Sequence, residues 1–520
     1  MMKRRTSTAQ RIRATAFFAA LVFVVLSLSA SAFGAPATAC DKLASLSFPN
    51  TTIHSAAAVA AGAFPPPGSG DAQSKAYASL PAFCRVAATI SPTSDSVIRV
   101  EVWMPESGWN QKFNAVGNGG WAGSIRYADM TAPLMAGYAT ASTDTGHEGN
   151  SGAFGLGHPE KLTDYSYRAI HEMTVFAKAI IGAYYGTAPK TSFFTGCSLG
   201  GHQALTEAEK YPADFAGIVA GAPSLSWNRL NAARIDINLI VHKSDDSYIP
   251  PAKYPVIHDA VLQACDALDG VKDGVLENPR QCHFDPKSLQ CNGPDGPSCL
   301  TAGQVQSAAA LYGPIKSPKT GQEIYPQMMQ PGSELGWATV AGPEPLGYAR
   351  EAFQYLVYKD PKWDWHRFNP ATDLDAALAV DTGLTDFDYP TLKPYFDRGG
   401  KLLVYHGWWD TTISPMGTVN YFESIRKRLG NGVVGKSIQL YMVPGMGHCT
   451  SGPGTDVFDK VGAIEDFVAK GAAPSQIIAS HKTGSTVDRT RPLCPFGKVA
   501  TYKGTGSTDE AANFVCAAER

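Results

Sequence analysis

The stretch Thr195-Gly196-Cys197-Ser198-Leu199-Gly200-Gly201 decides the fold of this 520-residue chain. It contains the pattern Gly-x-Ser-x-Gly, with Ser198 at its centre. An apolar segment, 192–194, precedes the pattern, and a helix-compatible segment, 202–208, follows it. This strand–turn–helix context predicts a nucleophile elbow, a strained turn that exposes the serine hydroxyl. The turn is so tight that the residues two before and two after the serine must be very small, and both are glycines.

Strand and helix patterns alternate in two blocks of the sequence. The expected strands are 97–104, 112–116, 138–142, 191–195, 217–222, 401–406 and 437–443. The expected helices are 167–185, 201–211 and 457–470. Such alternation is typical of a parallel sheet in an α/β layer fold.

Residues 223–397 interrupt this alternation. The segment is rich in Pro, Trp, Asp and turn signals, and it holds four of the ten cysteines. We therefore expect a catalytic domain in two pieces, 33–222 and 398–520. Residues 223–397 are expected to be inserted between these pieces as a lid domain.

The N-terminus has the three parts of a secretory signal peptide. Residues 1–32 carry five basic residues and no acidic one, and they contain an apolar run of about 15 residues followed by the small residues 30–32. A membrane anchor needs about 20 apolar residues, so this run favours a cleaved signal. We expect cleavage after Ala32, with a second candidate site after Ala39, and hence a secreted or periplasmic protein.

The composition excludes several classes of protein. With 44% hydrophobic residues, the chain can bury a large core and is not disordered. Removal of the signal leaves 39 of the 44 basic residues against 46 acidic ones, a net charge of −7. A nucleic-acid-binding protein is usually basic, and no later segment is apolar enough to span a membrane. We expect a soluble protein that binds neither nucleic acid nor membrane, and the sequence does not indicate an oligomeric state.

All ten cysteines follow the signal, and an even number in an oxidising compartment indicates disulfides. The count alone does not give their connectivity. Local spacing suggests the pairs Cys265–Cys282, Cys291–Cys299 and Cys494–Cys516, and a further pair, Cys40–Cys84, would tie down the new N-terminus. A lipid anchor is the alternative for Cys40, but the preceding residues lack the expected leucine. Cys197 and Cys449 then remain unassigned.

An elbow serine needs a histidine base and a carboxylate, in the chain order Ser, Asp or Glu, His. His448 lies in a flexible Gly-rich loop that follows a strong strand near the C-terminus. Asp410 lies just past the C-terminal end of strand 401–406, where the acid of a triad is well placed. We therefore expect His448 as the base and Asp410 as the acid. His406 and His481 remain alternatives for the base.

The two unassigned cysteines flank this expected triad. Cys197 immediately precedes Ser198, and Cys449 immediately follows His448. If the serine and the histidine meet, the two cysteines also come close. A disulfide between them would fix the nucleophile relative to its base.

The oxyanion hole is expected to use the amide of Leu199 and one amide from a Gly-rich loop after an early strand. The segment Gly117-Asn118-Gly119-Gly120-Trp121 is that loop. Either Gly119 or Gly120 would donate the second hydrogen bond, and the sequence does not distinguish them.

An Asp-rich loop in the insertion is a candidate cation site. Asp266, Asp269 and Asp273 lie within eight positions, separated by turn glycines. Hard oxygen ligands in a flexible loop suit Ca²⁺, with the backbone carbonyls of Val271 and Val275 as further ligands. The spacing is not that of an EF-hand, and the alternative is a solvated acidic turn. Because the loop lies away from the elbow, the site would be structural.

Together, Cys197-Ser198, Asp410 and His448-Cys449 resemble the CS-D-HC arrangement of the tannase and feruloyl esterase family. Bacterial hydrolases of mono(hydroxyethyl) terephthalate belong to the same family. The resemblance runs along nearly the whole mature chain and includes the segments 118–121, 143–147 and 266–275. It implies an α/β-hydrolase core with a large inserted lid domain, a structural Ca²⁺ in the lid, and the five disulfides paired as above. For segment 143–147 a structural part is the default interpretation.

The resemblance also implies a secreted serine esterase that hydrolyses esters of aromatic acids through an acyl-enzyme. Its substrate would be a small aromatic ester, including esters derived from plant polymers. A feruloyl or other hydroxycinnamoyl esterase ranks first, a tannase second and a terephthalate monoester hydrolase third. A non-catalytic binding protein on the same fold is the remote alternative.

Aromatic residues of the lid are candidates for contacting the aryl ring of such a substrate. They are Trp337, Tyr348, Phe353, Tyr355, Trp363 and Trp365. Many of them must instead form the core of the lid itself. Arg350 is a further candidate, for binding a substrate carboxylate.

Overall fold

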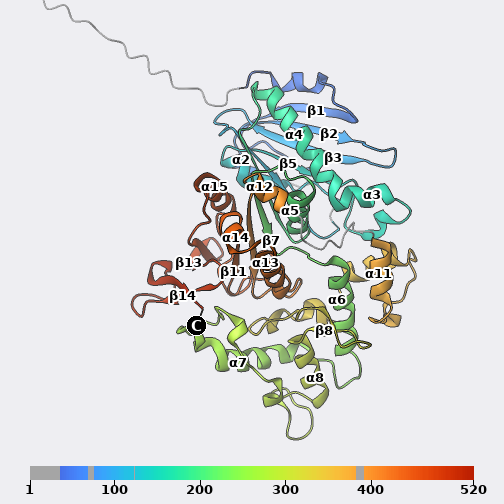
Figure 1. Cartoon of the computed structure of the whole chain (residues 1–520), viewed down its shortest axis with the longest axis vertical. Helices are drawn as coiled ribbons and strands as arrows, with labels where there is room; N and C mark the ends of the chain where they lie inside the picture. Colours follow the sequence, from blue (N-terminus) through green and yellow to red (C-terminus); the bar gives the residue numbers. More distant parts are fainter. Residues whose placement is uncertain (1–35, 68–74, 122, 382–391, 520) are drawn as a thin grey trace, which may run out of the picture. The chain divides into compact units, whose positions relative to one another are not determined.

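A sheet of nine strands forms the centre of the described chain (Figure 1). The computed structural model describes residues 36–67, 75–121, 123–381 and 392–519. The expected signal peptide, residues 1–32, lies outside this part, and Phe33–Arg520 form one compact unit. No helix within the described ranges is long and apolar enough to cross a membrane.

The sheet is mixed rather than purely parallel. In their order across it, the strands are β1 (Thr51–Val59), β2 (Phe83–Ile90), β3 (Ile98–Pro105), β5 (Ala139–Thr143), β4 (Lys112–Val116), β6 (Thr191–Cys197), β7 (Gly217–Gly221), β10 (Lys401–Gly407) and β11 (Ile438–Val443). The six strands from β5 to β11 in this order run parallel to one another. Antiparallel pairing adds β3, β2 and β1 at one edge. The sequence patterns predict β3 but not β1 and β2.

Helices cover both faces of the sheet because side chains alternate along each strand. Phe194 and Ile218 face a core shared with α4 (Ala169–Tyr185), α5 (Leu199–Lys210) and α13 (Pro415–Leu429). Their neighbours Phe193 and Val219 face the opposite side, against α15 (Lys460–Lys470). Helix α2 (Tyr127–Met135) packs on that second side as well, over β3 and β4. The short helix α14 (Asn431–Ser437) leads into β11.

The inserted segment leaves the sheet after β7 and returns at β10, which is the neighbour of β7. Its helices are α6 (Trp227–Val241), α7 (Tyr254–Cys265), α8 (Ala302–Leu311), α9 (Ala338–Ala341), α10 (Gly347–Glu351), α11 (Asp373–Asp381) and α12 (Lys393–Asp397), and its strands are β8 (Ile315–Lys316) and β9 (Glu323–Tyr325). The apolar core of this insertion also includes Trp121, Tyr165 and Leu199. The insertion therefore packs against the end of the sheet that carries Ser198, next to helix α3 (Pro159–Thr163) in Figure 1.

Two hairpins that the sequence patterns do not predict lie near the C-terminus. They are formed by β12 (Ile477–Thr483) with β13 (Thr486–Leu493) and by β14 (Lys498–Tyr502) with β15 (Phe514–Ala518). Ala500 and Phe514 of the second hairpin pack against Val271 of the Asp-rich loop. The C-terminal segment therefore contacts the insertion.

All five expected disulfides are present in the structure. They are Cys40–Cys84, Cys197–Cys449, Cys265–Cys282, Cys291–Cys299 and Cys494–Cys516. Every cysteine in the described ranges is therefore paired. This agreement confirms the connectivity expected from local spacing and from the positions beside the serine and the histidine.

Candidate active site

Ser198 lies in a strained turn between β6 and α5. Its φ of 64° and ψ of −122° belong to a region that non-glycine residues rarely adopt. A Cβ atom at Gly196 would lie 2.3 Å from the carbonyl oxygen of Gly200, and one at Gly200 would lie 2.9 Å from the carbonyl oxygen of Asn118. The close backbone approach therefore requires glycine at both positions, as the elbow motif predicts.

The structure brings Ser198, His448 and Asp410 together at the C-terminal ends of the parallel strands. Nε2 of His448 lies 2.9 Å from Oγ of Ser198. Nδ1 of the same ring lies 2.7 Å from Oδ2 of Asp410. These two hydrogen bonds allow the imidazole to take the serine proton while the carboxylate orients the ring. His481, an alternative base, instead bonds to Asp488 within the β12–β13 hairpin.

Asp410 is fully buried and accepts four hydrogen bonds. Oδ1 accepts from the amides of Thr412 at 2.7 Å and Ile413 at 3.0 Å. Oδ2 accepts from His448 and from Nε2 of His406, the latter at 3.0 Å. Burial alone would raise the pKa of Asp410, but the charge of His448 and the hydrogen bonds from both imidazoles hold that pKa well below its ordinary value. The acid therefore stays ionised beside its histidine.

His406, the other alternative base, instead supports the acid. Its side chain is fully buried, and Nε2 lies near Oδ2 of Asp410 and 3.2 Å from the carbonyl oxygen of Ile413. Because Nε2 faces two acceptors, it carries the proton, and Nδ1 accepts from the hydroxyl of Thr418 at 2.7 Å. The sequence signal for this role was its position at the end of the strand that precedes Asp410. The sequence pattern offered His406 only as an alternative base and not as a partner of the acid.

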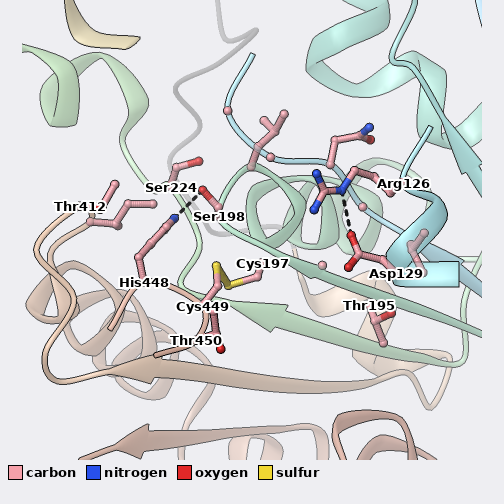
Figure 2. Close-up of a pocket in the computed structure, with 18 of the residues that line it drawn as sticks. Arg126, Asp129, Thr195, Cys197, Ser198, Ser224, Thr412, His448, Cys449 and Thr450 are labelled. Carbon is pink, nitrogen blue, oxygen red and sulfur yellow. Dashed lines mark hydrogen bonds and ion pairs between the residues drawn. A yellow bond between two sulfur atoms is a disulfide. The ribbon is translucent and has the colours of Figure 1, made fainter. Parts of the chain in front are cut away.

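The Cys197–Cys449 disulfide joins the chain neighbours of the serine and the histidine. Its two Cα atoms lie 6.0 Å apart, although 252 positions separate them in the sequence. Figure 2 shows the sulfur atoms directly beside the hydrogen bond between His448 and Ser198. The bridge therefore ties the elbow covalently to the loop of the base.

Leu199, Gly119 and Gly120, the expected oxyanion-hole residues, line the same cavity as Ser198. Leu199 is the first residue of α5, so its amide is one of the donors that a helix leaves without an intrahelical partner. The positive end of the helix dipole lies at the same place. Both glycines remain candidates for the second donor.

Asn118 holds the Gly-rich loop in position. Its amide donates to Oε1 of Gln203 at 2.9 Å, and its carbonyl accepts from the amide of Gly200 at 2.8 Å. Its side-chain amide donates to the carbonyl of Thr143 at 2.8 Å. The 143–147 segment thus braces the loop, as the structural interpretation of this motif expects.

A cavity of about 1370 Å³ contains Ser198 and His448. Its aromatic lining includes Trp121, Tyr165, Trp227 and Tyr348. Of the six lid aromatics expected at the substrate, Tyr348 alone is among the described lining residues. Trp337 and Phe353 are buried in the core of the insertion, and Trp363 and Trp365 pack against that core. Sequence reasoning missed the other three because they come from the catalytic domain and from the first turn of α6.

Arg350, the candidate for a substrate carboxylate, does not line this cavity. Its guanidinium pairs with Glu344 at 2.7 Å instead. The cavity does continue past the disulfide to a polar region, where Arg126 and Asp129 form an ion pair at 2.8 Å (Figure 2). Lys460 also lines this region.

The Asp-rich loop of the insertion is closed by hydrogen bonds to its own backbone. The carboxylate of Asp266 accepts from the amide of Gly274 at 3.1 Å. Asp269 accepts from Val271 at 2.9 Å, and Asp273 accepts from Val275 at 3.1 Å. These bonds hold the three carboxylates against the backbone of the loop.

A small cavity of about 20 Å³ lies beside this loop, large enough for one ion or water molecule. Asp269, Val271, Asp273 and Val275, four of the five expected calcium ligands, line it, together with Glu277, which we did not expect. Burial raises the pKa of Asp269 to about 6 and that of Glu277 to about 8, and neighbouring carboxylates add to both shifts. Crowded, partly buried oxygen ligands of this kind fit a cation, although Arg489 and Arg491 also line the cavity and pair with Asp273.

Comparison with known sequences gives a family match over most of the chain. A sequence model described as "Tannase and feruloyl esterase" matches residues 84–517. An uncharacterized esterase of Xanthomonas campestris pv. campestris is 37% identical, over 92% of this chain and 91% of that protein. A protein of Aspergillus terreus named "Probable feruloyl esterase B-2" is 33% identical, over 82% of this chain and 85% of that protein.

Solved structures share the fold. The crystal structure of feruloyl esterase B from Aspergillus oryzae has a TM-score of 0.84 and 28% identity, covering 92% of this chain and 99% of that chain. The tannin acyl hydrolase from Aspergillus niger has a TM-score of 0.76 at 21% identity, over 92% and 95% of the two chains, and agrees in fold. Because the family model and these relatives each match about four fifths of the chain or more, the chain belongs to the tannase and feruloyl esterase family of carboxylic ester hydrolases.

Proposed function

We propose that this protein is a serine esterase that hydrolyses esters of aromatic acids, with Ser198, His448 and Asp410 as its catalytic triad. The observation that carries the proposal is the continuous hydrogen-bonded chain of these three side chains in a cavity with aromatic lining. The family membership supports the same reaction class. An intact triad argues against a non-catalytic binding protein.

The reaction proceeds in two steps. Oγ of Ser198 attacks the ester carbonyl carbon while Nε2 of His448 takes its proton. The negative charge on the carbonyl oxygen is stabilised by the amide of Leu199 and that of Gly119 or Gly120. The protonated His448 then gives its proton to the leaving alcohol, and an acyl-enzyme forms. Water, deprotonated by His448, attacks the acyl-enzyme and releases the acid and the free serine.

A hydroxycinnamoyl ester such as a ferulate ester is the preferred substrate in this proposal. The flat rings of Trp121, Trp227 and Tyr348 suit contact with an aryl group. Two relatives with feruloyl esterase in their names support this choice over galloyl esters and terephthalate monoesters, which stay as alternatives. A panel of methyl ferulate, methyl gallate and a terephthalate monoester, compared by kcat/KM, decides among the three.

Substitution of the nucleophile tests the mechanism. Ser198→Ala should abolish turnover of methyl ferulate while the melting temperature stays within a few degrees of wild type. Ser288→Ala is a matched control, because that exposed hydroxyl lies in the insertion and bonds only to Asp285 in the described structure. Wild-type turnover by the Ser198 variant would show that another residue performs the attack.

We further propose a structural Ca²⁺ in the Asp-rich loop, held by Asp266, Asp269 and Asp273 with the carbonyls of Val271 and Val275. Its part would be structural, because the loop lies away from Ser198, and it would add to the charge that Arg489 and Arg491 already place beside Asp273. Incubation with EDTA should lower the melting temperature, and added Ca²⁺ should restore it. An unchanged melting temperature after complete metal removal contradicts the proposal.

Export follows from the proposed signal peptide and is consistent with five disulfides, which persist in oxidising compartments. We expect the mature protein to begin at Phe33, after cleavage behind Ala32. N-terminal sequencing of protein from the periplasm or the medium checks this. Recovery of the full-length chain from the cytoplasm alone would contradict it.

A further inference from the structure

Arg234, on helix α6, is a buried cation in the wall of the catalytic cavity. Its side chain is 5% exposed. Its hydrogen bonds go to neutral oxygens: Nε and Nη2 donate to the carbonyl of Thr412 at 3.2 and 2.7 Å, and Nη1 donates to Oδ1 of Asn231 at 2.9 Å. In the described structure, no carboxylate forms an ion pair with it.

Other enclosed arginines of the protein differ in this respect. Arg85 pairs with Glu101, Arg168 with Asp164, and Arg491 with Asp273. Buried charges are normally paired in this way because the loss of hydration is otherwise uncompensated. Arg234 has no such direct ion pair in the described structure, although the charge of the buried Asp410 acts on it, and it is the one of these arginines that lines the cavity containing Ser198.

The known contacts of Arg234 leave part of its donor capacity unused. A guanidinium has five N–H groups, and the three hydrogen bonds to Thr412 and Asn231 use three of them. Burial lowers the pKa of Arg234 to about 10, so the group is still charged at neutral pH. Two of the N–H groups of this cavity-lining residue are therefore without a described partner.

The position of Arg234 relative to the triad is fixed by Thr412. The amide of Thr412 donates to Asp410, and its carbonyl accepts from Arg234. In Figure 2, Thr412 lies next to His448 at the edge of the cavity. Thr412 therefore links the guanidinium of Arg234, on the insertion, to Asp410, the acid of the triad.

We propose that Arg234 is the specificity residue that binds an oxygen substituent on the aryl ring of the substrate. The two N–H groups without a described partner match a carboxylate or a phenolic oxygen, and the substrate supplies a direct acceptor for them. This inference rests on the proposed function, and it specifies the group on the acyl part of the substrate, an oxygen substituent of the aryl ring, that the site selects. Arg234 takes the place of Arg350, the candidate for a substrate carboxylate, which pairs with Glu344 and does not line the cavity.

Three methyl esters test the proposal: methyl benzoate, methyl 4-hydroxybenzoate and monomethyl terephthalate. We expect Arg234→Met to lower kcat/KM for at least one of the two substituted esters ten-fold or more beyond its effect on methyl benzoate. The ester that responds identifies the oxygen as phenolic or carboxylate. Arg367→Met, an exposed arginine on the insertion, is the matched control.

If Arg234 only holds the Thr412 loop in place, without contacting the substrate, a different result is expected. Arg234→Met would then lower kcat/KM for all three esters by the same factor, and that outcome overturns the proposal. If Arg234→Met does not fold, inhibition of the wild-type enzyme decides instead. We expect 4-hydroxybenzoate or terephthalate to inhibit at least ten-fold more tightly than benzoate, and equal inhibition by all three acids refutes the inference. Failure of the proposed function is distinguishable, because the wild-type enzyme would then hydrolyse none of the esters.

Discussion

Replacement of Asp410 by asparagine tests the hydrogen-bond network more sharply than removal of the side chain. The variant has nearly the same shape but carries one NH₂ group in place of a carboxylate oxygen. Because Oδ1 accepts from the amides of Thr412 and Ile413, an NH₂ group cannot replace it without facing two donors. The NH₂ group must therefore take the position of Oδ2.

In that position the NH₂ group faces Nδ1 of His448 and Nε2 of His406. Nδ1 of His448 must then act as an acceptor, so the ring proton moves to Nε2. A protonated Nε2 cannot take the proton of Ser198. Loss of the correct tautomer in a triad lowers kcat by about 10⁴-fold, which corresponds to about 5.4 kcal/mol in the barrier at 1.36 kcal/mol for each factor of ten.

The assay is steady-state hydrolysis of methyl ferulate at saturating substrate, with the melting temperature measured in parallel. Asp397→Asn is the matched control, because Asp397 is exposed and pairs only with Lys393 in the described chain. An Asp410→Asn enzyme that folds and keeps more than a tenth of the wild-type kcat would refute the tautomer argument.

Three further variants extend the test. His406→Leu removes one of the four hydrogen bonds that the buried Asp410 accepts. Because a hydrogen bond to a charged group contributes roughly 1.5–3 kcal/mol, kcat should fall about 10- to 100-fold. An unchanged kcat contradicts the supporting role of His406. The double variant Cys197→Ala/Cys449→Ala should lower kcat at least ten-fold. The control Cys291→Ala/Cys299→Ala, which removes a disulfide of the insertion, should leave kcat unchanged. Equal kcat values in the two double variants would contradict an active-site role of the Cys197–Cys449 disulfide. Asp144 is buried, and burial raises its pKa to about 7, above the value of about 3.9 for an unfolded chain. Its protonated form therefore stabilises the fold at low pH, and this contribution is lost as the pH rises from about 4 to about 7. Asp144→Asn should consequently gain melting temperature relative to wild type between pH 4.5 and pH 8, and a constant difference across that range contradicts this assignment.

The sequence predicted best those features that are local. The elbow requires glycines at fixed offsets from Ser198, and the strand before it and the helix after it are continuous in sequence. Asp410 and His448 follow parallel strands, so their strand-end positions predict that they meet. Four of the cysteine pairs were predictable for the same reason, since three lie close in sequence and the fourth lies directly beside Ser198 and His448. The Cys40–Cys84 pair, 44 positions apart, was instead expected from the need to tie down the new N-terminus.

Features made by packing of distant segments were not predictable. The cavity wall combines Trp121 with Trp227, one from a loop after β4 and one from the start of α6, and no periodicity links them. Glu277 lies only two residues beyond Val275, but its contact with the C-terminal hairpin, where the amide of Ala500 donates to Oε1 of Glu277 at 2.7 Å, joins segments far apart in sequence. β1 was missed because its Ala- and Thr-rich sequence lacks a strong apolar alternation.

The Cys197–Cys449 bridge has a further consequence for the integrity of the molecule. It closes a covalent ring over a sequence separation of 252, and every peptide bond of the insertion lies inside that ring. A protease that cuts the insertion once therefore opens the ring without releasing a fragment. The clipped protein should run as one species in a non-reducing gel and separate into two chains only after reduction, so Ser198 and His448 stay on one covalent molecule even when the polypeptide between them is broken.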